Sequence, residues 1–326
     1  MSVRMGIIGS GGIANHHLGI LAAMPDRVAL AAYCDPVLER AQNAADQYGG
    51  KAYSDAAAMC DAEELDAVGV FIPPVAHGAI ETMACERGIH MLIEKPCALD
   101  MRTGRAIEQA VRESGVITAI AYKYRWDAHV RKAREMLRSH RIGMVHGWFW
   151  CGMPGAPWWR KDAESGGQIV EQTTHIVDMA RYLVGDVAEV QAWFRRIGDG
   201  YQGPPSDVDD VGTVNLVFES GALGNISNTC MLDNWGSSGL RVMAQGFTLE
   251  VNGNRLSWAG TEGSGELEND EDGYAGEDEA FIHAIETGDR SRVYSDYADG
   301  LRSLAVSLAA RESACQGGSV VQVSDL

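Results

Sequence analysis

The stretch Gly9-Ser10-Gly11-Gly12-Ile13-Ala14 decides the fold of this chain. It fits the pattern G-x-G-x-x-[G/A], follows the apolar run Arg4–Ile8 and opens a helical pattern that continues to Met24. In such a context the first glycine permits a tight turn, the second lets the backbone approach a pyrophosphate, and the alanine lets helix and strand pack closely. Free N–H groups at the start of the helix then bind phosphate. The stretch therefore predicts a dinucleotide-binding cradle.

Asp35 adds to this prediction, because it stands at the end of the next apolar run, Val28–Cys34. A carboxylate at that point accepts hydrogen bonds from the hydroxyls of the adenosine ribose and repels a 2′-phosphate. Asp35 therefore favours NAD over NADP as the cofactor. Alternatively, Asp35 caps the helix that begins at Pro36, and the two roles are compatible.

Residues 1–122 alternate apolar strands with helical patterns. Continuous apolar strands separated by helices predict a parallel sheet that is covered on both faces. The predicted strands are Arg4–Ile8, Val28–Cys34, Leu65–Ile72, Ile89–Ile93 and Val116–Ala121, and the predicted helices are Gly12–Met24, Pro36–Tyr48, Ala76–Arg87 and Met101–Ser114. We therefore expect an α/β domain over residues 1–122, with the doubly wound parallel sheet of a Rossmann fold.

The pattern changes near Tyr122, and residues 123–326 predict a second, α+β domain. Period-2 alternation between turns rich in Gly, Asn and Asp predicts a largely antiparallel open sheet. Its predicted strands are Met144–Cys151, Val187–Arg196, Val211–Glu219, Ala222–Leu232, Leu240–Val251, Arg255–Trp258 and an edge strand Val320–Val323. The predicted helices are Asp127–His140, Thr174–Leu183, Glu277–Thr287 and Tyr297–Ala314. The acidic stretch Glu262–Glu279 predicts a solvated loop whose last acids lie favourably at a helix N-terminus.

The composition limits the partners of the chain. Its net charge is −18, from 27 basic and 45 acidic residues, which argues against nucleic acid or an anionic membrane. No apolar run approaches the roughly 18 residues of a membrane span. The chain runs from Met1 directly into a strand, which predicts no signal peptide. Seven scattered cysteines without a C-x-x-C pair predict reduced thiols. We therefore expect a cytoplasmic protein that binds a small molecule.

The tripeptide Glu94-Lys95-Pro96 closes the predicted strand 89–93. Ligands of open α/β sheets bind at the carboxyl ends of the strands, so a lysine there can reach both cofactor and substrate. Four further motifs lie before and after this tripeptide: Ile72–His77, Tyr122–Arg125, Trp159-Arg160 and Gly166–Asp178.

Together, and over nearly the whole chain, these motifs resemble the glucose-fructose oxidoreductase / inositol dehydrogenase / MocA (Gfo/Idh/MocA) family of oxidoreductases. The resemblance implies a nicotinamide held in the cleft between two domains, and an open sheet that commonly builds homodimers or homotetramers. It implies that Lys95, often before a cis proline bond, contacts the substrate and the nicotinamide ribose. His175 is then the acid/base candidate. Glu171 stands where the family most often has aspartate, and Thr173 stands where it usually has glycine.

The resulting site prediction has three parts. The expected catalytic residues are Lys95, His175 and Glu171. The expected cofactor-binding residues are Gly9, Ser10, Gly11, Gly12, Ile13, Ala14, Asp35, Ile72, Pro73, His77, Glu94, Lys95, Lys123, Trp159 and Arg160. The expected substrate-binding residues are Lys95, Tyr124, Arg125, Trp158, Glu171 and His175.

Hydride transfer from a secondary alcohol needs a base for the hydroxyl proton and a positive group for the developing alkoxide. His175 suits the first role, since imidazole ordinarily titrates near neutrality. Lys95 suits the second and could also relay the proton, so the primary base stays open between them. Glu171 and His175 can converge if they share a helix face. No metal is expected, because this pair has no third ligand at convincing spacing.

The tryptophans and phenylalanine at positions 148–150, 158 and 159 predict either a sugar-binding cleft or the core of a strand; Trp148 and Trp150 share a strand face.

We expect an NAD-dependent dehydrogenase that acts on a secondary hydroxyl or keto group of a sugar, sugar acid or inositol. Two alternatives remain. One is a glycoside-cleaving enzyme of the same superfamily, which oxidises the sugar transiently with tightly bound NAD and eliminates the aglycone. The other is a non-catalytic regulator that senses a sugar or a dinucleotide.

Overall fold

The computed structural model describes residues 2–233, 235–261 and 263–326. It divides into two compact units, Met1–Trp126 with Asp272–Leu301, and Asp127–Glu271 with Arg302–Leu326. The sequence placed residues 123–326 in one continuous domain, and the structure differs because residues 272–301 return to pack within the first unit.

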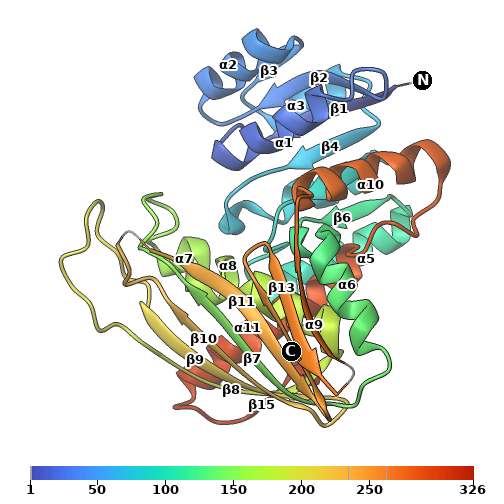
Figure 1. Cartoon of the computed structure of the whole chain (residues 1–326). Helices are drawn as coiled ribbons and strands as arrows, with labels where there is room; N and C mark the ends of the chain where they lie inside the picture. The colour runs from blue at the N-terminus through green and yellow to red at the C-terminus, as the bar shows by residue number, and fades with distance from the viewer. Residues whose placement is uncertain (1, 234, 262) are drawn as a thin grey trace. The chain divides into compact units, whose positions relative to one another are not determined.

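The first unit holds a six-stranded parallel sheet in the order β3-β2-β1-β4-β5-β6 (Figure 1). The strands are β1 Val3–Ile8, β2 Val28–Cys34, β3 Lys51–Tyr53, β4 Ala67–Val70, β5 His90–Ile93 and β6 Thr118–Ile120. This is the strand order of the dinucleotide-binding fold, so the predicted fold class is confirmed for this half. The short strand β3 was missed, since its Lys-Ala-Tyr sequence has no apolar run.

A helix follows each of the strands β1 to β5 of the first unit, and α10 Gly273–Thr287 joins them from late in the chain. The other helices are α1 Gly12–Ala22, α2 Leu38–Tyr48, α3 Ala56–Ala62, α4 Ala79–Glu86 and α5 Met101–Ser114, with the 3₁₀ turns η1 Pro74–Ala76 and η2 Lys123–Trp126. Helix α10 belongs here because Phe281 and Ile282 lie in one buried core with Met5 of β1 and Leu18 of α1. Burial of these side chains holds a late segment of the chain against the sheet.

The second unit holds a nine-stranded sheet in the order β14-β13-β12-β11-β7-β10-β9-β8-β15. Its strands are β7 Ile142–Trp150, β8 Val187–Arg195, β9 Val211–Phe218, β10 Leu223–Thr229, β11 Ser237–Ala244, β12 Phe247–Asn252, β13 Arg255–Gly260, β14 Gly263–Glu268 and β15 Val321–Gln322. All pairs are antiparallel except β10 with β7. The prediction of a largely antiparallel open sheet with a C-terminal edge strand is confirmed.

One predicted strand, Leu240–Val251, is in fact a hairpin. Strands β11 and β12 are separated by Gln245 and Gly246, and Gly246 has φ +71. A glycine in this left-handed region reverses the chain where the apolar alternation alone predicts continuity.

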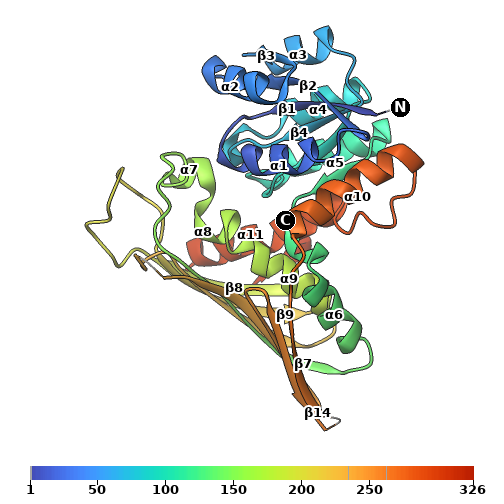
Figure 2. The same ribbon diagram turned by 45° about the horizontal axis from the view of Figure 1, so that its top comes forward.

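One face of the second sheet is covered by helices of its own unit (Figure 2). They are α6 Ala128–Leu137, α7 Asp162–Ser165, α8 Gly167–Glu171, α9 Thr174–Val184 and residues 302–315 of α11 Tyr297–Cys315. Gly147 of β7 faces Ile176 of α9, whereas Met144 on the same strand faces away and is 50% exposed. The strands therefore alternate between a core face and an open face.

No helix among the described residues is long and apolar enough to span a bilayer. All seven cysteines are free thiols, as the sequence predicted.

Candidate active site

The glycine cradle has the geometry that the sequence predicts. Gly9 has φ +89, and a Cβ at this position would lie 2.2 Å from the carbonyl oxygen of Phe71. Only glycine therefore fits the turn from β1 into the cradle. By contrast, a Cβ built on Gly11 or Gly12 would meet no atom within 4 Å, so the backbone is open toward solvent where a phosphate group would approach.

The start of α1 is suited to an anion. Gly11 is its N-cap and supplies no side-chain hydrogen bond to the first N–H groups of the helix. The buried Oγ of Ser10 has no hydrogen-bond partner among the described residues. Ala14 is fully buried against the sheet, which allows the close packing the motif requires. These donors fit the pyrophosphate of a dinucleotide.

Asp35 links the cradle to the second strand. Its Oδ2 accepts a hydrogen bond of 3.0 Å from the backbone N–H of Ser10, and its Oδ1 accepts one of 2.9 Å from Val37. Helix α2 begins at Leu38 with Val37 as its N-cap, so Asp35 is not the cap of that helix. A carboxylate fixed by two backbone donors retains lone pairs for ribose hydroxyls.

The loop after β4 contains three predicted cofactor contacts, Ile72, Pro73 and His77. The imidazole of His77 is buried, and its Nδ1 lies 2.6 Å from the Oε1 of Glu81. The other oxygen of Glu81 accepts the N–H of Gly78 at the start of α4. The Nε2 of His77 has no partner within the described parts of the chain, which leaves it for a ligand group.

The tripeptide Glu94-Lys95-Pro96 lies at the carboxyl end of β5, and the Lys95–Pro96 bond is cis, as the resemblance implied. The side chain of Glu94 is buried rather than directed to solvent. Its Oε2 accepts the backbone N–H of Lys95 at 3.0 Å. Lys95 itself is half-buried.

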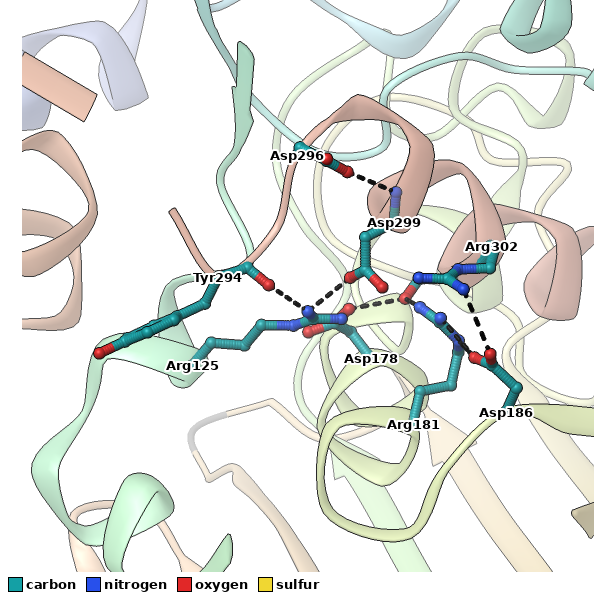
Figure 3. A network of polar contacts seen from close by, with 9 residues as sticks. Arg125, Asp178, Arg181, Asp186, Tyr294, Asp296, Asp299 and Arg302 are labelled. Carbon is teal, nitrogen blue, oxygen red and sulfur yellow. Dashed lines mark hydrogen bonds and ion pairs between the residues drawn. The ribbon is translucent and has the colours of Figure 1, made fainter. Parts of the chain in front are cut away.

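The next predicted contacts, Lys123, Tyr124 and Arg125, lie in the turn η2. The ammonium of Lys123 lies 4.1 Å from the centre of the Tyr274 ring, a cation–π contact. Arg125 is buried, and its guanidinium donates to the carbonyl of Tyr294 and pairs with the carboxylate of Asp299 (Figure 3). Arg125 therefore joins the two segments of the first unit, residues 1–126 and 272–301, a structural role that the sequence did not predict.

In the second unit, Glu171 and His175 lie on successive helices. Glu171 ends α8, Gln172 and Thr173 form a turn, and His175 lies in the first turn of α9. The expectation that the pair shares one helix face is therefore wrong. The helix breaks because the N–H of Thr173 returns to the carbonyl of Gln168, and α9 then starts anew.

Glu171 is positioned by a tryptophan. The indole Nε1 of Trp159 donates to the Oε2 of Glu171 at 2.6 Å. Trp159 is itself buried with Val208 and Cys230, and Trp158 packs at the edge of this cluster. Trp159, a predicted cofactor contact, thus holds the predicted catalytic carboxylate.

Arg160, the other predicted cofactor contact here, is also buried. Its guanidinium donates to the backbone carbonyls of Pro154, Gln202 and Pro204. It therefore fixes the loop before α7 to the loop before β9 within the second unit.

The tryptophans of β7 have different surroundings from Trp158 and Trp159. Trp148 and Trp150 lie on the open face of the sheet, with ring centres 5.9 Å apart. Trp150 also lies 6.2 Å from the exposed Trp235. Trp148 is nonetheless buried, with 8% of its surface exposed, whereas Trp150 is half-buried, so the alternative of core packing holds for Trp148.

The first unit contains a buried group that the sequence did not predict. His17 of α1 and Glu277 and Asp278 of α10 have side chains that are fully buried. The acidic stretch was therefore wrongly predicted to be solvated at these two acids; Glu262 lies outside the described residues. The helical spacing from Glu277 to Phe281, four residues apart, was the available signal that Glu277 shares the core face.

Comparisons with known proteins agree with this architecture. The family model described as "Oxidoreductase family, NAD-binding Rossmann fold" matches residues 3–122, and the "GFO/IDH/MocA C-terminal domain" matches residues 130–264. D-apiose dehydrogenase of Paraburkholderia graminis is 30% identical over 66% of this chain, and the match spans 57% of that relative.

Two longer matches cover almost the whole chain. Myo-inositol 2-dehydrogenase of Thermotoga maritima is 28% identical over 95% of this chain and 96% of its own length. The crystal structure of the WlbA dehydrogenase from Bordetella pertussis, in complex with NADH and UDP-GlcNAcA, matches with a TM-score of 0.86 at 25% identity, over 98% of this chain and 97% of that one.

Proposed function

Because this chain belongs to the Gfo/Idh/MocA family of NAD-binding oxidoreductases, we propose that it oxidises a secondary hydroxyl, or reduces the matching keto group, of a sugar, sugar acid or inositol. The observation that supports this most is the first unit: an open glycine cradle, a fixed Asp35 and a lysine at the carboxyl end of β5. The relatives described above are named as dehydrogenases, so neither the glycoside-cleaving nor the regulatory alternative is favoured.

The chemistry divides among few groups. Bound NAD would supply the hydride acceptor. The cradle would hold the pyrophosphate, and Asp35 the adenosine ribose. The Lys95 ammonium would bind the substrate oxygen and stabilise negative charge that develops there. His175 would accept the hydroxyl proton, with Glu171 beside the substrate, held by Trp159.

The proposal is tested with a panel of sugars, sugar acids and inositols and NAD⁺, with NADH formation followed by absorbance. We expect one class to give NADH in stoichiometric amounts with the keto product. Aglycone release without net NADH would instead support the glycoside-cleaving alternative. Binding of NAD without turnover of any sugar or polyol in either direction would refute the proposal.

We also propose that the open face of the second sheet joins two copies of the chain. Met144 of β7 and Leu223 of β10 are register partners, and the exposed fractions of their side chains are 50% and 52%. Trp150, at the other end of the same face of β7, lies 6.2 Å from the exposed Trp235, measured between the ring centres. Large exposed apolar patches mark interaction surfaces.

Sedimentation of the wild-type chain should show a dimer or tetramer. The double variant Met144→Lys with Leu223→Lys should shift it toward the monomer, because two charges per copy would be buried at the interface. The matched control Val320→Lys changes an apolar residue of comparable exposure, 54%, outside this patch. A monomeric wild-type chain would contradict the proposal.

A further inference from the structure

A group of four titratable side chains is buried in the first unit beneath the cradle helix. We call His17, Glu94, Glu277 and Asp278 the His17 cluster. They come from three elements, with His17 in the middle of α1, Glu94 at the end of β5 and the two other acids in α10. Three of the four side chains have no exposed surface, and Glu94 is 5% exposed.

The imidazole of His17 lies between two carboxylates. Its Nδ1 is 2.8 Å from the Oδ1 of Asp278, and its Nε2 is 3.4 Å from the Oε1 of Glu94. The ring stacks on Phe71, with the centres 4.3 Å apart. A neutral imidazole can donate through only one nitrogen, whereas an imidazolium donates through both. The geometry therefore fits a doubly protonated His17.

The surrounding charges agree with this protonation state. Burial by itself lowers the pKa of His17, but Asp278 and Glu94 outweigh it and raise that pKa well above its ordinary value. Burial by itself would raise the pKa of Glu94. The hydrogen bond from His17 and the charge of Lys95 outweigh burial, and they lower the pKa of Glu94 below its usual range. Burial raises the pKa of Asp278 above its ordinary value, although the positive charge and the hydrogen bond of His17 lower it in part.

Glu277 differs from the other acids of the cluster. Neither of its carboxyl oxygens has a hydrogen-bond partner among the described residues. Complete burial raises its pKa well above the ordinary value, and the nearby Asp278 adds to this, although the charges of His17 and Lys123 oppose it. A neutral carboxylic acid is the form that such an environment favours.

The cluster is connected to the proposed reaction centre by one residue. The Oε1 of Glu94 is hydrogen-bonded to the Nε2 of His17, and its Oε2 accepts a hydrogen bond from the backbone N–H of Lys95. The carboxylate is thus a rigid link between helix α1 and the turn that carries the lysine. Removing the donor at Oε1 would leave a buried carboxylate with one fewer hydrogen bond, and it would rotate toward other donors.

We propose that His17 is a positioning residue: donating from its two ring nitrogens to Asp278 and Glu94, it orients Glu94, and through Glu94 it sets the place of Lys95. This inference rests on the proposed dehydrogenase function, in which Lys95 binds the reacting oxygen. It adds Asp278, from a segment near the far end of the sequence, to the residues that support Lys95.

The same side chains could hold a divalent cation. One ligand atom from each of His17, Glu277 and Asp278 lies within 4.8 Å of the others. A cation on a ring nitrogen of His17 would need the lone pair of a neutral imidazole and the ionised form of Glu277. The two models therefore predict opposite protonation states, and the isosteric variant Glu277→Gln separates them.

The first experiment compares His17→Gln with His16→Gln, the neighbouring histidine on α1, whose side chain is 46% exposed. We expect His17→Gln to lower kcat about tenfold or more, since small displacements of a catalytic group are costly, with the KM for NAD changed less than about threefold. His16→Gln should leave kcat unchanged. Glu277→Gln should also leave kcat and the melting temperature nearly unchanged, because an amide replaces a neutral acid.

A second measurement does not depend on turnover. In ¹⁵N-histidine-labelled protein, the His17 signals, assigned by their loss in His17→Gln, should show both ring nitrogens protonated well above pH 6.5. A neutral His17, or full kcat in a folded His17→Gln variant, overturns the inference. Bound Mn²⁺ or Zn²⁺ in the wild-type chain that Glu277→Gln abolishes overturns it in favour of a cation site. If no substrate turns over, the proposed function fails, while the histidine spectrum still decides the charge of His17.

Discussion

The candidate residues of the two units are held in place in different ways. In the first unit, Gly9, Asp35 and Lys95 stand where backbone rules put them: in the turn after β1, at the end of β2 and at the end of β5. In the second unit, Glu171 is held by the indole of Trp159, and the loop beside it by Arg160. Positions fixed by the backbone follow from local sequence, whereas positions fixed by side chains depend on residues that are distant in the chain.

The largest expected effect tests the backbone-fixed lysine. Lys95→Met removes the ammonium but keeps the length of the side chain, so kcat should fall about 10²- to 10³-fold, as when one stabilising donor of a reaction centre is lost. The Kd for NADH, measured by fluorescence, should change little, because the cradle is intact. A variant with wild-type kcat would remove Lys95 from the mechanism.

A pair of glycine variants tests the cradle itself. Gly9→Ala puts a Cβ against the Phe71 carbonyl at a positive φ, and should lower the free energy of unfolding by about 1–3 kcal/mol. Gly11→Ala meets no protein atom, so stability should hold while the Kd for NAD rises about tenfold. Urea unfolding and NAD titration check both. Equal behaviour of the two variants would contradict the assigned roles.

A smaller effect is expected when Glu171 loses the side chain that holds its carboxylate in place. Trp159→Phe keeps an aromatic ring in the buried cluster but removes the N–H donor to Glu171, a hydrogen bond worth about 1.5–3 kcal/mol when the acceptor is charged. Part of this loss should appear as a fall in kcat/KM for the sugar of about tenfold, with the Kd for NAD unchanged. Trp148→Phe, which removes an indole donor to the Oγ of Ser237 on the open face of the sheet, is the matched control. Equal losses in both variants would speak against this contact.

The smallest expected effect is the pH dependence of stability, to which the buried histidines His129 and His17 contribute with opposite sign. Burial lowers the pKa of His129 in α6 below its ordinary 6.5, and its Nε2 donates to the carbonyl of Gly253. The unfolded chain then takes up a proton that the folded chain does not, so stability falls as pH drops through 6.5. For His17 the folded pKa is raised, so its stabilising contribution is full below 6.5 and is lost as pH rises through the folded value.

Unfolding free energies from pH 5 to pH 9 check this contrast. His129→Gln should flatten the loss on the acidic side, and His17→Gln should flatten the loss on the alkaline side. Slopes that are unchanged in both variants would show that neither histidine differs in pKa between the folded and unfolded states.

Much of the first unit could be predicted because its signals are local. The apolar runs, the glycine motif and the acid after β2 are each complete within a few residues, and the predicted bounds of β2 and α5 are those of the structure. The errors arose where distant contacts decide. The helix breaks at Thr173 because its backbone N–H bonds to the carbonyl of Gln168. Arg125 is buried because its guanidinium has partners in the carbonyl of Tyr294 and the carboxylate of Asp299.

The sequence by itself determined the fold class, the NAD-binding cradle and the family, because glycine geometry and strand periodicity are properties of short segments. Only the tertiary structure decided which charged side chains are buried and which partners they meet. Glu268 and Glu277 belong to one acidic stretch, yet Glu268 is exposed, whereas burial in α10 makes Glu277 part of the His17 cluster. The free energy of a charge depends on the dielectric and the partners around it, and these come from elements far apart in the chain.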